Sequence, residues 1–285
     1  MFSARRIRDK AFWGLCLLAL ALIAAPALSV IVSVFHQAAP SLSLSLLTTP
    51  TQGDHGGLQN AILGTLMLLL GVLVVAGTVG VAAGIYLAEF STPKVGSVLR
   101  FFSEVLAGMP SIVIGYVGYL SLVVGFHWGY SLVAAVLALS VLVVPYIVKT
   151  TEVALTSVPS ALREASASLG VTRTTSVGKI LLPPAIPGIV SGLIVALAIS
   201  TGETAPLLFT ANFLDARNPS LTHLTHQAVP YLTAVTFNDL SLPGAKPHQL
   251  AAAAGAVTLI ILIILIIVGR VVSSRARRKT SGMVL

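Results

Sequence analysis

Two glutamates lie inside strongly apolar segments of the chain. Glu104 opens the stretch EVLAGMPSIVIG, and Glu203 lies within STGETAPLLFTA. An ionisable side chain is costly to place in a hydrocarbon layer, so such residues typically belong to a pathway for a polar or charged solute. A carboxylate repels an anion, but it can accept a hydrogen bond from a protonated oxyanion or hold an arginine of a neighbouring subunit.

The first of these stretches also predicts an interruption of its helix. Proline removes a backbone donor and suits the first turn of a helix, so we expect the span to break at Gly108–Pro110 and to restart there. The restarted helix would present free N–H groups and a positive dipole end to an anion. The alternative is a simple proline kink. The candidate pathway residues are Glu104, Pro110, Ser111, Glu203 and Thr204.

The amino-acid composition indicates that the whole chain is an integral membrane protein. Hydrophobic residues make up 56% of the 285 and charged residues only 9%, with a mean hydropathy of +0.96. Soluble domains carry about 25% charged residues, so an ordinary soluble fold is excluded. We therefore predict one all-α integral membrane domain over residues 1–285, with six transmembrane helices of about 20 residues. We place the spans at about Trp13–Phe35, Ala61–Leu87, Phe101–Phe126, Ser131–Val148, Gly188–Phe209 and Gln249–Gly269.

The N-terminal region and two longer loops complete this plan. The apolar run after the basic N-terminus exceeds the 7–15 residues of a signal core, so we expect a retained first span. This span and its loop occupy residues 1–55. We expect Gln37–Asn60 to be an irregular connection. The loop Ala211–Lys246 is too apolar for a simple linker and can hold either a short surface helix or a docking surface.

The basic residues orient the chain. The net charge is +8, and with the N-terminus inside, every Lys and Arg except Arg217 and Lys246 falls on the inner side. This asymmetry follows the positive-inside rule and predicts cytoplasmic termini and a cytoplasmic loop over Thr150–Pro187. The basic tail Arg275–Lys279 is expected to contact anionic headgroups. We therefore expect no nucleic-acid partner.

A polar, helix-forming stretch lies between two strongly apolar segments, at Ser160–Pro187, SALREASASLGVTRTTSVGKILLPPAIP. We expect a helix from Pro159 that Gly170 ends, because glycine readily adopts the left-handed conformation at a helix C-terminus. We expect a second short helix over Thr174–Leu182, which Pro183 and Pro184 stop before the next span. A rigid helix–turn–helix of this kind can transmit force from another protein. Its expected charged surface is formed by Arg163, Glu164, Arg173 and Lys179.

This stretch resembles the EAA loop of permeases of ATP-binding-cassette (ABC) importers. Ser166 stands where the family usually has alanine. In that family the loop supplies a coupling helix that docks into the ATPase subunit. The resemblance implies a MetI-like type I permease core over residues 56–272, with a cytoplasmic EAA coupling helix. The implied coupling residues are Glu164, Ala165, Ser166, Gly170, Ile180, Leu182 and Pro183.

Narrower strings resemble the PstA-type permease subunits of bacterial phosphate importers. They are GETAPLLFTA, LAGMPSIVIG and GGLQNAILGTL, and the resemblance runs from about Gly56 to the last span. It implies a bacterial inner membrane, phosphate as substrate, a PstC-type permease partner, a PstB-type ATPase dimer and a PstS-type phosphate-binding protein. A hydrogen bond to the Glu203 carboxylate would favour hydrogen phosphate over sulfate, because only hydrogen phosphate has a proton to donate.

This sequence departs from these relatives at the position of a basic residue that could bind phosphate. Relatives often carry an arginine a few residues before GET, where this sequence has Ile199, Ser200 and Thr201. The basic group that binds phosphate can therefore come from the partner permease.

The chain is expected to perform no covalent chemistry. It has no phosphate-binding P-loop, because Gly178-Lys179 is followed by Ile180 and position 173 is arginine. No H-E-x-x-H motif and no Ser–His or paired-Asp arrangement occurs within the spans. We expect no metal site and no cofactor in this chain, with ATP–Mg bound by the partner ATPase subunits. Alternative interpretations are a permease for another oxyanion (molybdate or sulfate), an intramembrane enzyme or a passive channel.

Overall fold

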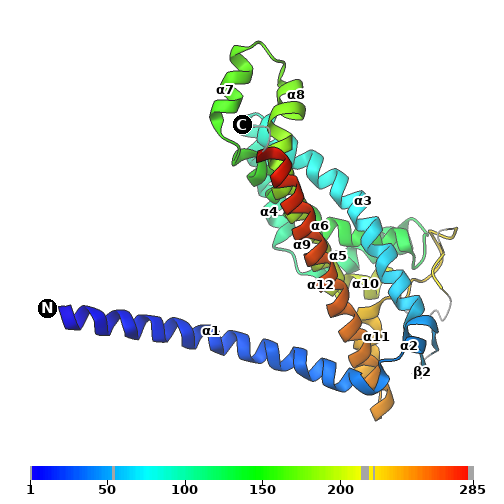
Figure 1. Cartoon of the computed structure of the whole chain (residues 1–285). Coiled ribbons are helices and arrows are strands. Elements are labelled where there is room, and N and C mark those ends of the chain that lie inside the picture. The colour runs from blue at the N-terminus through cyan, green and yellow to red at the C-terminus, as the bar shows by residue number, and fades with distance from the viewer. Residues whose placement is uncertain (1, 53–54, 213–217, 221, 282–285) are drawn as a thin grey trace.

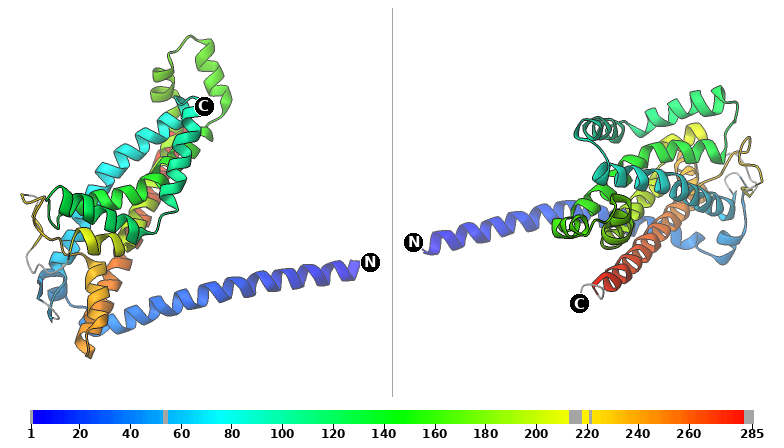
Figure 2. Two further views of the ribbon diagram at one scale, coloured as in Figure 1. Left: turned by 180° about the vertical axis from the view of Figure 1, so that it is seen from behind. Right: turned by 90° about the horizontal axis from the view of Figure 1, so that it is seen from above.

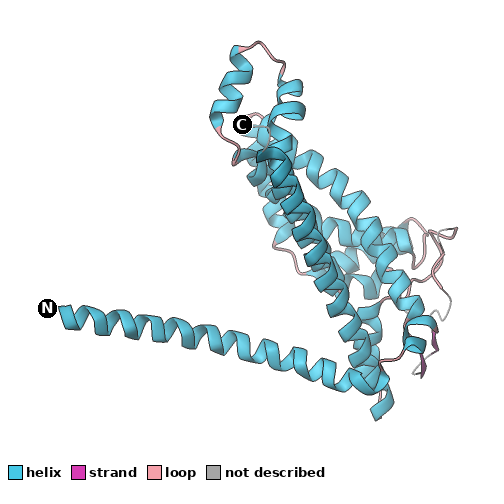
Figure 3. Cartoon of the chain, viewed as in Figure 1, coloured by secondary structure: helices cyan, strands magenta, loops and turns pink. Residues whose placement is uncertain are grey.

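The computed structural model describes residues 2–52, 55–212, 218–220 and 222–281. Long helices form a bundle, and one helix runs away from it (Figures 1 and 2). Helices dominate the described chain, as Figure 3 shows. Among the residues that the structure describes, five helical segments are long and apolar enough to cross a membrane. They are α1 (Phe2–Ala38), α3 (Gln59–Glu89), α6 (Leu132–Thr156), α9 (Leu182–Gly202) with the short helices that precede it, and α12 (Ala245–Ser281).

The remaining predicted span, Phe101–Phe126, consists of two helices joined at a sharp bend. Helix α4 (Pro93–Ala107) ends, and after three intervening residues α5 (Ser111–Gly118) begins and continues as the π-helix η2 (Tyr119–Gly125). The two halves are bent by 97°. The predicted break is therefore confirmed, and a simple proline kink is excluded.

Helix α6 lies between α3 and α9, and glycines allow the close approach on both sides. A Cβ atom placed on Gly80 would lie 2.7 Å from Ile147 Cβ, and one on Gly188 would lie 2.7 Å from Ala154 Cβ. Gly84 and Gly192, one turn further along, meet Thr151 and Thr150 in the same way. Small residues at such spacing let helix backbones pack closely where the surroundings are apolar.

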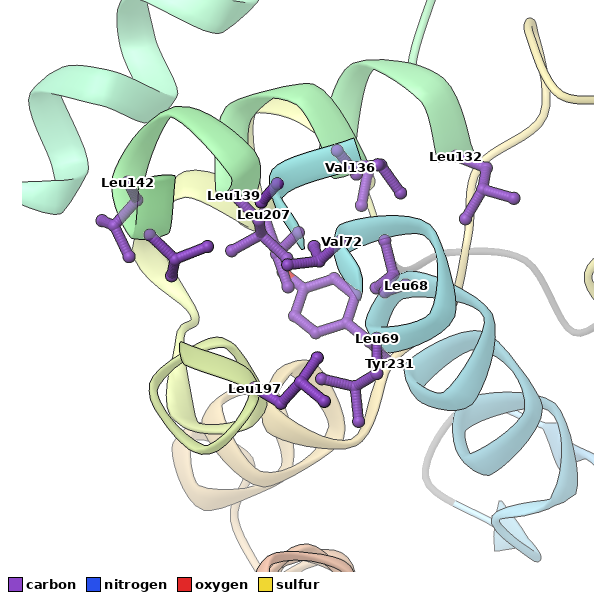
Figure 4. Close-up of a cluster of buried hydrophobic side chains, with 14 of the residues drawn as sticks. Leu68, Leu69, Val72, Leu132, Val136, Leu139, Leu142, Leu197, Leu207 and Tyr231 are labelled. Atoms are coloured by element: carbon purple, nitrogen blue, oxygen red, sulfur yellow. The ribbon is translucent and has the colours of Figure 1, made fainter. Parts of the chain in front are cut away.

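Tyr231 fills the centre of the main apolar cluster. Its ring is 1% exposed and lies among leucines of α3, α6 and α9 (Figure 4). Burial raises the pKa of its hydroxyl, which therefore stays protonated. Tyr231 precedes α11 (Leu232–Ser241), whose buried residues include Leu232 and Val235 and which packs against α12. The loop over residues 211–246 thus holds a short helix, but that helix is packed into the bundle.

The connection Gln37–Asn60 is more ordered than its composition predicts. It contains the 3₁₀-helix η1 (Ala39–Ser41), helix α2 (Leu44–Thr48) and the two-residue strands β1 (Thr51–Gln52) and β2 (His55–Gly56). The expectation of an irregular loop was wrong because local polar side chains order this backbone. Ser43 caps α2, and the Asn60 side chain accepts hydrogen bonds from the N–H and the hydroxyl of Thr51 at 3.0 and 2.9 Å.

Helix α1 stands apart from the other spans. Its C-terminal end, at Val34, Phe35 and Ala38, packs against α12. The central turns leave their apolar side chains exposed and lead away from the bundle (Figure 1).

Replacing Gly84 by alanine is expected to lower the thermal stability of the protein. The new methyl group would lie 2.5 Å from Thr151 Cβ and 2.8 Å from the Val148 carbonyl oxygen. Overpacking of this kind costs about 1–3 kcal/mol. Thermal unfolding in detergent measures the effect. Gly178→Ala is the matched control, because a Cβ there meets no described atom within 4 Å. An unchanged melting temperature for Gly84→Ala would contradict the close α3–α6 contact.

Candidate functional site

A helical hairpin stands out from one end of the bundle (Figure 1, green). It consists of α7 (Ser160–Ser168), a tight turn and α8 (Arg173–Ser176), and we refer to it as the α7–α8 hairpin. Gly170 has a φ of +70°, as a left-handed cap requires. The N–H groups of Val171 and Gly170 donate to the carbonyls of Ser166 and Ala167 at 3.1 and 3.0 Å. These two bonds are those of the Schellman motif, so the predicted helix end at Gly170 is confirmed.

The second leg of the hairpin continues into a span without a stop. Helix α8 passes through the π-helix η3 (Val177–Leu181) directly into α9. The prediction that Pro183 and Pro184 end this helix was wrong. Both prolines fall in the first turn after the π-helix, a position where a missing N–H is tolerated. Movement of the hairpin therefore acts on the same continuous helix that forms the next span.

The seven predicted coupling residues occupy three different environments. Glu164 and Ala165 are exposed on α7. Ser166 is buried in the hairpin: its hydroxyl donates to the Arg163 carbonyl at 2.8 Å and lies 2.8 Å from the Ser176 hydroxyl. At the base of the hairpin, partly buried side chains pack against the apolar cluster around Leu155 and Leu181. Those at the base are Ile180, Leu182 and, half-buried beside them, Pro183.

Leu169 lies at the tip of the hairpin, next to Gly170, and is 81% exposed. The sequence prediction did not include this residue. Its position just before the capping glycine was the available signal, because residues at the end of a protruding helix have few neighbours in their own chain.

Arg163 does not belong to the exposed charged surface that the sequence predicted. Its guanidinium turns back toward the bundle and pairs with Glu89, the last residue of α3, with Nη2 2.7 Å from Oε1. Glu89 is only 6% exposed. On the second leg, the Arg173 guanidinium lies 5.6 Å from the centre of the Phe90 ring, a cation–π distance. Both legs of the hairpin therefore contact the end of α3.

Glu203 and Thr204 lie at a second interruption. Helix α9 ends at Gly202 and α10 (Ala205–Thr210) begins after these two residues, although the sequence predicted one continuous span over Gly188–Phe209. Pro206 lacks the backbone donor that a continuous helix would use here. The Glu203 carbonyl accepts a hydrogen bond from the Thr233 hydroxyl at 3.0 Å. Backbone groups freed by a break in a span need such internal partners.

The two interrupted spans meet through their second halves, α5 and α10. A Cβ on Gly115 would lie 2.5 Å from Pro206 Cα, and one on Gly118 would lie 3.1 Å from Thr210 Cγ2. The Tyr116 and Phe209 rings pack edge-on at 5.9 Å. In these contacts, later residues of α5 meet later residues of α10, so the two helices run parallel. Their N-terminal ends, which carry the predicted pathway residues Pro110, Ser111, Glu203 and Thr204, lie at the same end of this pair.

Glu104 lies on the other side of the 97° bend, exposed on α4. It lines a cavity of about 200 Å³ between α4 and α6, together with Arg100, Lys149 and Glu152. The Arg100 Nε lies 2.7 Å from Glu152 Oε1. The described structure therefore places Glu104 among charged residues of both signs at a helix interface. The 97° bend separates it along the chain from the α5–α10 contact.

The sequence reasoning missed the glutamates that are most buried. Glu89 and Glu152 are 6% and 8% exposed, whereas Glu104 is exposed. Helix α6 continues beyond the predicted end at Val148, and its buried stripe runs on through Thr151, Glu152 and Leu155. That helical spacing was the signal for Glu152. Glu89 had no local signal, because its partner lies 74 residues away.

Comparison with known proteins places this architecture in a class. Residues 80–278 match the family of binding-protein-dependent transport system inner membrane components, and the chain belongs to this family. It is an integral membrane permease with the MetI-like fold, as the sequence predicted. Phosphate transport system permease protein PstA 2 of Mycobacterium bovis is 46% identical over 275 residues, which cover 96% of this chain and 91% of that protein.

Solved structures support the same fold. A chain of a bacterial alginate ABC transporter, in complex with an alginate-bound periplasmic protein, superposes with a TM-score of 0.68 at 15% identity, over 95% of this chain and 96% of that chain. A chain of the MetNI methionine ABC transporter in an inward-facing conformation gives a TM-score of 0.58 at 19% identity, over 77% and 94%.

Replacing Ser166 by alanine is expected to destabilise the hairpin, because the buried Ser176 hydroxyl loses its side-chain partner. A hydrogen bond of this kind contributes about 1 kcal/mol. Thermal unfolding of Ser166→Ala, Ser176→Ala and the double variant forms a double-mutant cycle. We expect the double variant to lose less stability than the sum of the single losses. Additive losses would contradict a direct bond between the two hydroxyls.

Proposed function

We propose that this chain is the PstA-type permease subunit of a bacterial phosphate importer. The observation that carries the proposal is the 46% identity to a phosphate permease over nearly the whole chain. Phosphate is favoured over molybdate or sulfate on this ground. In this proposal the chain forms half of a translocation pathway, with a PstC-type permease as the other half, and a PstS-type protein delivers phosphate to it.

Energy would come from outside the chain. A PstB-type ATPase dimer would bind and hydrolyse ATP–Mg, and this permease would remain non-catalytic. The proposed orientation places both termini and the α7–α8 hairpin in the cytoplasm, where the ATPase is. The distribution of basic residues supports this orientation.

The α7–α8 hairpin is proposed to be the coupling element. Glu164, Ala165 and Leu169 are exposed on it and available to a partner, whereas Ser166 and Gly170 set its shape. A leucine that is 81% exposed outside the apolar bundle suits an apolar pocket of the docked ATPase. The packed base at Ile180, Leu182 and Pro183 would pass the movement to α9.

The substrate pathway is proposed to run past the two interrupted spans. Pro110 and Ser111 begin the restarted helix α5, whose free N–H groups suit an anion. Glu203 and Thr204 occupy the break before α10, where a carboxylate can accept a hydrogen bond from hydrogen phosphate. Glu104, in the charged cavity between α4 and α6, would act at a different point along the pathway.

The experiment that tests this function is reconstitution of the chain with candidate permease and ATPase partners in lipid vesicles. We expect a co-purifying assembly that imports phosphate when ATP and a phosphate-loaded binding protein are present. Molybdate and sulfate should neither stimulate ATP hydrolysis nor compete with phosphate. Stimulation by sulfate or molybdate in place of phosphate would support the oxyanion alternative, and uptake independent of ATP would support a channel.

Leu169→Asp is expected to weaken binding of the ATPase subunit, because it places a charge in the proposed apolar pocket. Loss of a buried anchor residue costs about 2 kcal/mol or more, a fall in affinity of more than about tenfold. Recovery of the ATPase with the purified permease measures it. The control is Leu44→Asp on α2, a similarly exposed leucine (78%) outside the hairpin. Equal ATPase recovery with both variants would contradict docking at the hairpin tip.

Glu203→Gln is expected to reduce the preference for phosphate over sulfate. The amide keeps the shape of the side chain but can donate a hydrogen bond to a fully deprotonated oxyanion. Loss of a charge-assisted hydrogen bond corresponds to about a tenfold change in selectivity. Uptake of labelled phosphate in competition with sulfate measures the ratio. Selectivity equal to that of the unmodified protein would rule out the proposed role of Glu203.

A further inference from the structure

The Arg163 side chain joins three helices through a single guanidinium group. Its Nη2 and Nε donate to the Glu89 carboxylate at 2.7 and 3.3 Å. Its Nη1 donates to the Val158 carbonyl at 2.8 Å, and Nη2 also donates to the Leu155 carbonyl at 2.7 Å. Arg163 itself lies on α7, next to the predicted coupling residue Glu164.

The acceptors lie at the ends of two long spans. Glu89 is the last residue of α3, and Leu155 lies in the last turn of α6, with Val158 just after it. Carbonyl groups at a helix C-terminus lack a partner within their own helix. The guanidinium therefore donates to one carbonyl in the last turn of α6, which also accepts from the Val158 N–H, and to the Val158 carbonyl just after the helix. It also neutralises the buried carboxylate at the end of α3.

This geometry fixes the direction of the first hairpin leg relative to both spans. The guanidinium is planar and carries five donors in a fixed fork, so the four bonds hold α7 in one orientation. A lysine retains the positive charge but offers a single ammonium group on a flexible stem, which cannot hold this set of acceptors in the same way. If α7 turns, the ends of α3 and α6 must turn with it, or these bonds must break.

The second hairpin leg makes a weaker contact with the same end of α3. Arg173 is exposed, and its guanidinium lies over the Phe90 ring. An exposed cation–π contact constrains geometry less than several hydrogen bonds to a buried carboxylate. Arg173 therefore provides a matched control: it is an arginine of the same hairpin, and it contacts Phe90, which directly follows Glu89.

We propose that Arg163 is a positioning residue that transmits movement of the α7–α8 hairpin to α3 and α6, with buried Glu89 as its anchor. This inference rests on the proposed coupling function of the hairpin. With the connection intact, force on α7 reaches α3 and α6 in addition to the covalent path into α9. Without it, the hairpin still binds the ATPase, but the spans follow its movement incompletely.

The test uses the complete reconstituted transporter and compares the ratio of phosphate imported to ATP hydrolysed. Arg163→Lys and Glu89→Gln should retain ATPase binding and ATP hydrolysis while the transport ratio falls by about fivefold, in the range typical of coupling between sites. Arg173→Lys should keep the ratio of the unmodified protein. A normal ratio in Arg163→Lys and Glu89→Gln would overturn the proposal. A parallel loss of binding, hydrolysis and transport would also overturn it, since it would indicate a purely structural role.

A distance measurement on the purified chain keeps the test independent of transport. The only cysteine in the sequence, Cys16, is first replaced by alanine. Spin labels at Ala82→Cys on α3 and Ser168→Cys on α7 in this background report how firmly the hairpin is held. Arg163→Lys should broaden the distance distribution, and Arg173→Lys should leave it narrow. An unchanged distribution in Arg163→Lys would contradict the connection. If the assembly imports no phosphate, the proposed function fails while this measurement still decides whether Arg163 fixes the hairpin.

Discussion

The close packing of α6 between α3 and α9 is the constraint on which the other features depend. Glycines at 80 and 84 on α3, and at 188 and 192 on α9, let the three backbones approach closely. In lipid, helices gain little from hydrophobic burial, so packing of this kind and internal hydrogen bonds hold them together. Because α6 is fixed on both sides, its C-terminal end is a firm base for the α7–α8 hairpin.

Two features built on this packed core give the protein its function in our account: the pair of interrupted spans and the α7–α8 hairpin. The interruptions before α5 and α10 free backbone groups, and the two restarted helices pack in parallel. The hairpin extends from the other end of α6 and returns through η3 into α9. In the proposed coupling, force on the hairpin would reach the helix that leads to the Glu203 break, and the Arg163–Glu89 pair would extend that path to α3.

Local sequence patterns predicted much of this architecture. Apolar runs located the spans, Pro110 marked a real break and Gly170 marked a helix end, because each effect acts within a few residues. The continuity through Pro183 was missed because tertiary packing and a π-helix accommodated the prolines. The Arg163–Glu89 pair was missed for a different reason: no local pattern connects residues so far apart in the chain.

The central claim is that the α7–α8 hairpin lies in the cytoplasm and docks into the ATPase subunit. Its most direct test is site-specific labelling at position 169 in intact cells, with cysteine replacing Leu169 in a Cys16→Ala chain. The account predicts that a membrane-impermeant thiol reagent labels this position only after the membrane is opened. It also predicts that a short cross-linker joins position 169 to the ATPase subunit. Labelling from outside intact cells, or a functional assembly in which position 169 never cross-links to the ATPase, would contradict it.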